Sequence, residues 1–116
     1  MWAVEIDPLA LPEVEALPAS LKAKLALYIE RIQSNGVQSL EPGAVRHLDG
    51  KLWELRLKAQ SGIARALYFT LHPKRVFIVS AYVKKSQKLP GNEKAKAEKR
   101  MKAALAAEET RNKSRK

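Results

Sequence analysis

The sequence contains no cysteine. Disulfide bonds and thiolate metal sites are therefore excluded, and the composition suits the reducing cytoplasm. No apolar run approaches the roughly 18 residues that a membrane-spanning helix needs. The first residues, 1–7, are acidic rather than basic, so we expect no secretory signal there.

Carboxylates are scarce in the segment with the densest strand-like sequence. Glu54 is the only one within residues 52–88, whereas a metal-dependent nuclease needs clustered acidic ligands. No His, Cys and Asp cluster has the spacing of a metal site, and no Gly-rich phosphate loop precedes a helix. The sequence therefore predicts no metal and no cofactor. His47 and His72 lie in expected loops, where a lone histidine is more often incidental than catalytic, although imidazole titrates near neutrality.

Positive charge is abundant and unevenly distributed. The 116 residues include 22 Lys and Arg against 12 Asp and Glu, which gives a formal net charge of +10. Residues 84–116 alone hold 12 basic and 4 acidic side chains. This asymmetry predicts an anionic partner, which is a nucleic acid, an acidic protein or a membrane surface. A solubilising tail is the alternative interpretation.

Alternation of apolar and polar residues predicts a meander of strands. Residues 52–58 and 63–71 follow the period of two that is typical of half-buried strands. In the second segment this period puts Arg65 and Tyr68 on opposite faces. Residues 75–83 are almost wholly apolar, which predicts a central strand covered on both faces.

A further strand and a helical hairpin are predicted before this meander. Residues 2–7 alternate like a strand, and a short helix is expected around residues 12–17, since proline is tolerated in a first turn. A longer helix spans residues 18–34 with an apolar stripe at helical spacing, and residues 35–36 (Asn-Gly) end it. The hairpin either covers the core or offers a docking face. Residues 37–50 are expected to be a loop.

A C-terminal helix is predicted from Asn92, a good N-cap, to about Ala107 or slightly beyond. Its apolar side is narrow, and its opposite side is basic, through Lys96, Lys99, Arg100 and Lys102. The basic side is either a solvated surface or a binding face. Residues 108–116 lack an apolar anchor and are expected to form a flexible basic tail.

The predicted fold class is α+β. Residues 1–107 form one domain, because domains of about 100–150 residues are the commonest size. We expect an antiparallel twisted sheet of about four strands, with the N-terminal helical hairpin and the basic C-terminal helix packed against it.

Cations and phenols gather on the predicted sheet. Arg56 lies on the polar face of its strand, and Arg65 begins the next strand. Arg65 either reaches the end of the sheet or pairs with Glu54 or Asp49. Tyr68 and Tyr82 are either stacking rings for RNA or core-edge aromatics, and Lys84, Lys85 and Lys88 complete the set.

Three segments give the chain a family resemblance. The residues 52–56 (LWELR), 65–68 (RALY) and 82–90 (YVKKSQKLP) come in the order and spacing of the phage-derived, HigB-like branch of the RelE toxin superfamily, which the chain resembles over roughly residues 1–107. Two positions depart from the family. Ala64 stands where an aromatic residue is usual, and Tyr82 stands where phenylalanine is usual.

The resemblance implies the toxin of a type II toxin–antitoxin system. Such toxins are small, basic, cytoplasmic endoribonucleases that cut mRNA, usually on the ribosome, and that a small antitoxin, commonly a helix-turn-helix protein, holds inactive. They need no metal, since the RNA supplies its own 2′-OH as nucleophile. Arginine suits this chemistry because its fork of donors matches phosphate oxygens, and aromatic rings stack unpaired bases.

Carried over by motif, the catalytic residues are predicted to be Arg56, Arg65 and Lys85. The predicted RNA-binding residues are Lys58, Tyr68, Tyr82, Lys84, Gln87, Lys88, Lys99 and Arg100. Two alternative functions stay open. The first is a catalytically inactive nucleic-acid-binding or regulatory module with the same fold, which Ala64 favours. The second is a membrane-surface or acidic-protein binder, for which the apolar stripe of the C-terminal helix is thin.

Overall fold

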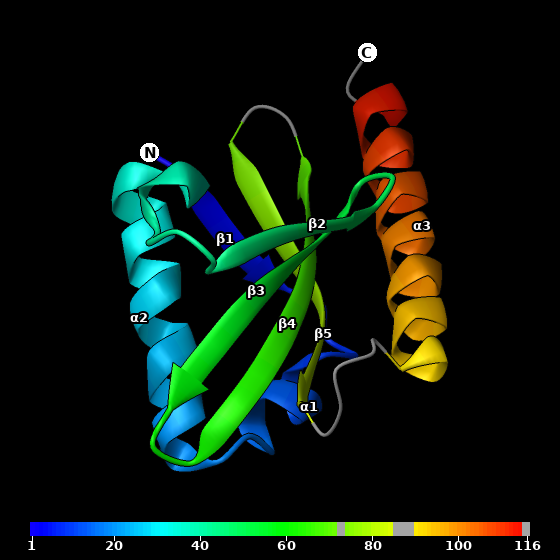
Figure 1. Cartoon of the computed structure of the whole chain (residues 1–116). Helices are drawn as coiled ribbons and strands as arrows, with labels where there is room; N and C mark the ends of the chain where they lie inside the picture. The colour runs from blue at the N-terminus through cyan, green and yellow to red at the C-terminus, as the bar shows by residue number, and fades with distance from the viewer. Residues whose placement is uncertain (72–73, 85–89, 115–116) are drawn as a thin grey trace.

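The computed structural model describes residues 1–71, 74–84 and 90–114 and has an α+β fold, as predicted (Figure 1). A strand and two helices come first, then four strands, then a long helix. In chain order the elements are β1 (Ala3–Ile6), α1 (Leu11–Glu15), α2 (Ala19–Asn35), the 3-10 helix η1 (Val37–Ser39), β2 (Val45–Asp49), β3 (Leu52–Ala59), β4 (Gly62–Leu71), β5 (Arg75–Val83) and α3 (Gly91–Ser114).

The sheet has five strands in the order β1-β5-β4-β3-β2, where about four were predicted. The additional strand is β2, which lies in the segment expected to be a loop and pairs antiparallel with β3. The sheet is also mixed rather than purely antiparallel, because β1 runs parallel to β5. The middle strand is β4, so the prediction that β5 is central was wrong, although β5 is an inner strand between β1 and β4.

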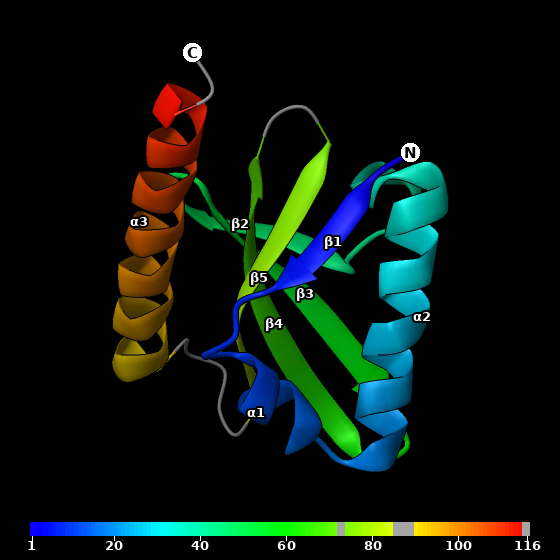
Figure 2. The same ribbon diagram turned by 180° about the vertical axis from the view of Figure 1, so that it is seen from behind.

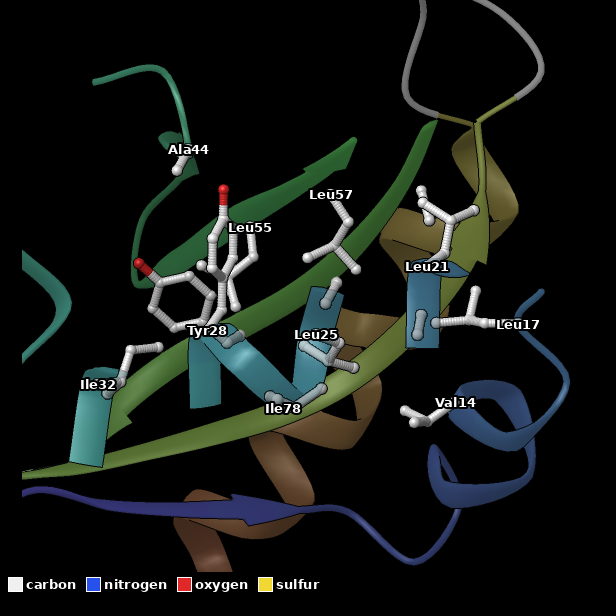
Figure 3. Packing of buried hydrophobic residues seen from close by; sticks show 14 of the residues in the cluster. Val14, Leu17, Leu21, Leu25, Tyr28, Ile32, Ala44, Leu55, Leu57 and Ile78 are labelled. Atoms are coloured by element: carbon white, nitrogen blue, oxygen red, sulfur yellow. The ribbon is translucent and has the colours of Figure 1, made fainter. Parts of the chain in front are cut away.

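Helix α2 covers one face of the sheet and forms the main core there (Figure 3). Its apolar stripe, which includes the buried residues Leu21, Leu25 and Ile32, packs against Leu55 and Ile78 of the sheet. The sequence left two interpretations of the helical hairpin open, and this packing is the core cover. We call this side of the sheet the α2 face.

Gly36 ends α2 in the way that the sequence predicted. Its φ of +87° lies in the region that favours glycine, and its N–H donates to the carbonyl of Ile32 at 2.8 Å. A Cβ atom at this position would lie 2.8 Å from Nε1 of Trp2. The glycine therefore lets the chain turn sharply while the N-terminal strand passes close by.

Helix α3 packs on the other face of the sheet, as the two opposite views show (Figures 1 and 2). Ala97 and Met101 contact a second, smaller apolar cluster that includes Leu67 and Phe69. Within the described residues, neither α3 nor any other helix has the length and apolar character to cross a membrane.

The predicted end of this helix near Ala107 was wrong, because α3 continues to Ser114. Glu108 lies in the part that was expected to be a tail, yet it forms an ion pair with Arg75 of β5. Arg75 also contacts Glu5 of β1 at 3.0 Å. A long-range ionic contact of this kind has no signature in local sequence.

Candidate nucleic-acid interface

The strand register brings three of the predicted residues into one row. Arg56 of β3 lies opposite Arg65 of β4, and Arg65 lies opposite Tyr82 of β5. Directly opposed residues of neighbouring strands project from the same face. Leu67, which shares that face with Arg65, packs in the cluster beneath α3. The row therefore lies on the face opposite the α2 core.

More cations surround this row. Lys58 shares a strand and a face with Arg56, and the N–H of Lys84 donates to the carbonyl of Ile63 at 2.8 Å, which continues the ladder between β4 and β5. Arg46 of β2 pairs in register with Glu54 and is exposed. We call the surface formed by Arg46, Arg56, Lys58, Arg65 and Lys84 the basic face.

The two arginines of the row differ in exposure. The side chain of Arg56 is 42% exposed and that of Arg65 only 3%. Nε of Arg65 lies 3.3 Å from Oε1 of the fully buried Glu54, and Nε of Arg56 lies 3.9 Å from the same oxygen. The sequence left open whether Arg65 reaches the end of the sheet or pairs with a carboxylate, and in the structure it pairs with Glu54. One carboxylate thus holds two guanidinium groups together that would otherwise repel each other.

Tyr82 of the row and Lys84 beside it both have altered pKa values. Burial raises the pKa of the Tyr82 phenol, and the neighbouring Arg65 opposes this shift only in part. Tyr82 is therefore a neutral phenol near pH 7. Partial burial lowers the pKa of Lys84, and the positive charges of Arg65 and Arg56 lower it further. Lys84 is therefore better suited to proton transfer than an isolated lysine.

Tyr68 does not belong to this surface. It lies opposite Trp53 and Ile78 in the register, is 2% exposed, and packs in the core on the α2 face. Burial raises its pKa. Its predicted role in RNA binding is therefore wrong, and Tyr68 is a core residue. Ala64, where the family has an aromatic residue, is also fully buried in that core.

The predicted residues of α3 divide into two cases. Lys99 is exposed. Arg100 is not a free RNA-binding group, because its Nη1 donates to Oε1 of Glu13 at 2.9 Å and to the carbonyl of Val79 at 2.8 Å. Arg100 thereby ties α3 to α1 and β5, which corrects the prediction. Lys85, Gln87 and Lys88 lie outside the described residues.

Arg46 and His47 were expected to lie in a loop, but the structure places both in β2. Arg46 reaches the basic face only because β2 pairs with β3, and no alternation predicted that strand. The ring of His47 instead packs at a tilt of 57° against Trp53, with ring centroids 4.8 Å apart, and Nε2 lies 2.8 Å from the carbonyl of Gly50. His47 and Trp53 are register partners, so His47 projects from the face opposite the arginine row.

No group of three or more His, Cys, Asp or Glu side chains within residues 1–71, 74–84 and 90–114 is placed to hold a metal ion. The arrangement offers guanidinium, ammonium and phenol groups instead. Such a set is able to bind a phosphate, stabilise added negative charge and move a proton.

Comparisons with known proteins agree with this fold. The model of the family "phage derived protein Gp49-like (DUF891)" matches residues 12–102. A comparison with curated proteins gives no match. Among solved structures, a free-state mutant of the E. coli toxin RelE is 20% identical with a TM-score of 0.60, and the match covers 85% of this chain and 96% of that one.

Two other structures are similar. The E. coli RelBE toxin–antitoxin complex contains a chain that is 20% identical, with a TM-score of 0.51 and a match over 74% of this chain and 100% of that one. The isolated E. coli RelE toxin is 19% identical, with a TM-score of 0.54 and coverage of 75% and 89%. At these identities the similarity establishes a shared fold.

Proposed function

The chain belongs to the phage-derived Gp49-like family, and from this premise we propose that it is the toxin of a type II toxin–antitoxin system. Its activity is the cleavage of mRNA on the ribosome without a metal ion, in the cytoplasm. The similarity to the E. coli toxin RelE supports this proposal at the level of the fold. The chemistry must come from the residues of this chain.

The observation that carries the proposal is the row of Arg56, Arg65 and Tyr82 across three strands, with Lys84 beside it. RNA contains its own nucleophile, the 2′-OH, next to each phosphate. Its oxygen attacks the phosphorus and loses a proton, the bond from phosphorus to the 5′-oxygen breaks, and that oxygen gains a proton. The products are a 2′,3′-cyclic phosphate and a 5′-OH. A protein that promotes this step needs to hold the phosphate and stabilise its extra charge.

The exposures of the side chains suggest different roles in this step. Arg56 is accessible and contacts the phosphate directly through its fork of donors. Arg65 lies behind it, adds positive potential, and shares Glu54 with it. Lys84, with its lowered pKa, moves a proton. We keep Lys85 as a second candidate for that task on the strength of the sequence motif, and Lys58 and Lys99 as contacts for the RNA backbone.

A second function is favoured by one specific observation. The guanidinium of Arg65 is almost wholly buried and paired with Glu54, so its charge is partly neutralised. This arrangement also fits a module that binds nucleic acid without cleaving it. In that case substitutions on the basic face weaken RNA binding, and the chain has no effect on mRNA ends.

The test is induced expression of the chain, followed by measurement of growth and mapping of mRNA 5′ ends. We expect slowed growth and new 5′ ends within coding regions. The variant Arg56→Ala/Lys84→Ala should abolish both effects. Lys22→Ala/Lys74→Ala is the matched control, since it removes the same charge from exposed positions on α2 and just before β5, and it should behave like the parent. Unchanged mRNA ends with RNA binding intact would support the non-catalytic alternative.

We also propose that the chain has a cognate antitoxin, commonly of the helix-turn-helix type. The E. coli RelBE complex, which shares the fold of this chain, supports such a partner. Co-expression with the product of the adjacent reading frame should restore growth. If no neighbouring protein does so, the assignment to a two-component system is wrong.

A further inference from the structure

A cavity opens at the edge of the sheet beside the basic face. Strand β2 begins at Val45, opposite Leu55, and the last contact across this edge is the N–H of Arg56 donating to the carbonyl of Ala44 at 2.8 Å. Strand β3 continues to Ala59, so its end extends beyond β2. A cavity of about 300 Å³ lies here, with Arg56 and Lys58 among its walls.

Part of the cavity lining is apolar. Tyr28 of α2, Leu57 of β3 and Ile63 of β4 contribute to it. Tyr28 is 3% exposed, and Leu57 is fully buried. The volume is at the lower end of the range of small-molecule sites, which suits a planar ring better than a large ligand.

One carboxylate stands in the wall. Glu41 accepts a hydrogen bond from the hydroxyl of Tyr28 at 2.6 Å and one from Nη1 of Arg31 at 3.2 Å. The hydrogen bond from Tyr28 lowers the pKa of Glu41, and burial together with Glu41 raises the pKa of Tyr28 to about 12. Near neutral pH Glu41 is therefore an ionised acceptor. Its two oxygens offer about four lone-pair sites, so it has capacity for a further donor.

We propose that this cavity is a nucleotide subsite, which takes up the base next to the phosphate held at Arg56 and Lys58. Arg56 belongs both to the arginine row and to the wall of the cavity, so a phosphate bound there leaves the neighbouring base within reach of it. The inference rests on the proposed function in one respect, namely that the polymer bound at the basic face is RNA.

The basic face needs such a subsite in order to recognise RNA. Phosphate contacts position a nucleic acid but do not distinguish its sequence, and single-stranded RNA is read through bases that leave the stack and enter pockets. Tyr68, which was expected to stack on a base, lies in the core. The cavity at the end of β3 adjoins the exposed arginine.

The carboxylate gives the subsite a preference. Glu41 accepts hydrogen bonds from the exocyclic amino group of cytosine, adenine or guanine, whereas uracil presents a carbonyl oxygen at the equivalent position of cytosine. The subsite should therefore favour cytosine over uracil, two rings of the same size.

Titration of the full chain with CMP, UMP and inorganic phosphate, followed by amide NMR, tests the inference. We expect CMP to shift the amide signals of Gly43 and Ile63, which line the cavity, and phosphate to leave them in place. CMP should bind about tenfold more tightly than UMP, which corresponds to about 1.4 kcal/mol. If phosphate and CMP give the same shifts and the same affinity, there is no base subsite.

Substitutions sharpen the result. Ile63→Trp fills the cavity and should weaken CMP binding about tenfold while phosphate still binds. Thr70→Trp is the matched control, because Thr70 is an exposed residue of the same strand that lies away from this cavity, and it should bind CMP like the parent. Glu41→Gln should reduce the difference between CMP and UMP. Equal CMP binding by the Ile63→Trp variant and the parent overturns the proposal.

This experiment separates the subsite from the proposed function. Nucleotide shifts in the cavity without any change of mRNA ends on expression would retain the subsite and overturn the nuclease. Cleavage of mRNA by a chain whose cavity signals do not respond to CMP would retain the nuclease and overturn the subsite.

Discussion

The two faces of the sheet are built on different principles. On the α2 face, large apolar side chains such as Leu21, Leu25 and Leu55 meet in one continuous core. On the opposite face, α3 contributes mostly small or partly exposed residues, such as Ala97 and Met101, and is fixed by ion pairs. The comparison indicates that most of the apolar packing lies on the α2 face, whereas a smaller apolar cluster and several ion pairs lie on the opposite face.

Cations of the basic face and of α3 are paired with carboxylates. Glu54 is fully buried beside Arg65 and near Arg56, and Glu13 accepts from Arg100 while its second oxygen lies 2.8 Å from Nζ of Lys96. A buried charge is tolerated when it is paired in this way. The four predictions that follow break or sharpen the contrast between the faces, from the largest effect to the smallest.

Truncation of the α2 core should have the largest effect. Leu25 is 1% exposed, so Leu25→Ala should lower the free energy of unfolding by about 2–5 kcal/mol through lost burial and a cavity. Urea unfolding followed by circular dichroism measures this. Leu27→Ala is the control on the same helix, since Leu27 is 40% exposed, and it should cost less than about 1 kcal/mol. Equal losses would mean that the α2 face is not the main source of stability.

Removal of the accessible arginine should affect activity rather than stability. Arg56→Ala takes away a donor to the phosphate, which should lower the rate of RNA cleavage by about 10²–10³-fold. Because its side chain is 42% exposed, the free energy of unfolding should change by no more than about 1 kcal/mol. Single-turnover cleavage on programmed ribosomes is the measurement. A variant that unfolds but retains its rate per folded molecule would reverse the roles assigned to the two faces.

The ion pairs that hold α3 should contribute a smaller and pH-dependent part of the free energy of unfolding. Burial disfavours the charged form of Glu13, but hydrogen bonds from Arg100 and Lys96 lower its pKa. Its contribution is therefore present above its unfolded pKa of about 4.3 and is lost as the pH falls through the lower folded value. Glu13→Gln should cost about 1–3 kcal/mol at pH 7. The difference between parent and variant should shrink below about pH 4; a difference that stays constant to pH 2 would contradict it.

The smallest effect concerns long-range attraction. Lys58→Ala/Lys84→Ala removes two cations of the basic face, so the slope of log affinity against log salt for single-stranded RNA should become shallower by about 1.4. Binding measured by fluorescence anisotropy at several salt concentrations gives this slope. Lys22→Ala/Lys74→Ala, which removes the same charge from exposed positions elsewhere, should leave it nearly unchanged. A similar change in both variants would show that net charge, and not the basic face, attracts RNA.

Periodicity predicted most of the fold because apolar positions dominated each element. The apolar stripe of α2 and the alternating apolar residues of β3 and β4 are buried in the core. Strand β2 escaped prediction since its residues are half-buried or exposed and owe their conformation to pairing with β3. The extension of α3 beyond Ala107 depends on Glu108 and Arg75, which are far apart in the sequence.

The candidate site was predictable in part for the same reason. The period of two already put Tyr68 on the face opposite Arg65, and the family motif alone suggested a shared role; the alternation was the better guide. The burial of the Arg65 side chain depends on its ion pair with Glu54 and on the packing of neighbouring side chains. Periodicity does not encode these contacts. The cavity beside Arg56 is lined by residues of α2, a connecting segment and two strands. No local sequence pattern could therefore predict it.

The central claim is that the basic face lets a ribose hydroxyl cleave its own strand. The most direct test is cleavage of a ribosome-bound mRNA that carries 2′-O-methyl groups at the cut positions, compared with the unmodified mRNA. The account predicts that unmodified mRNA gives a 2′,3′-cyclic phosphate and a 5′-OH, and that the methylated positions are not cut. Cleavage at methylated positions, or products with a 5′-phosphate, would contradict it.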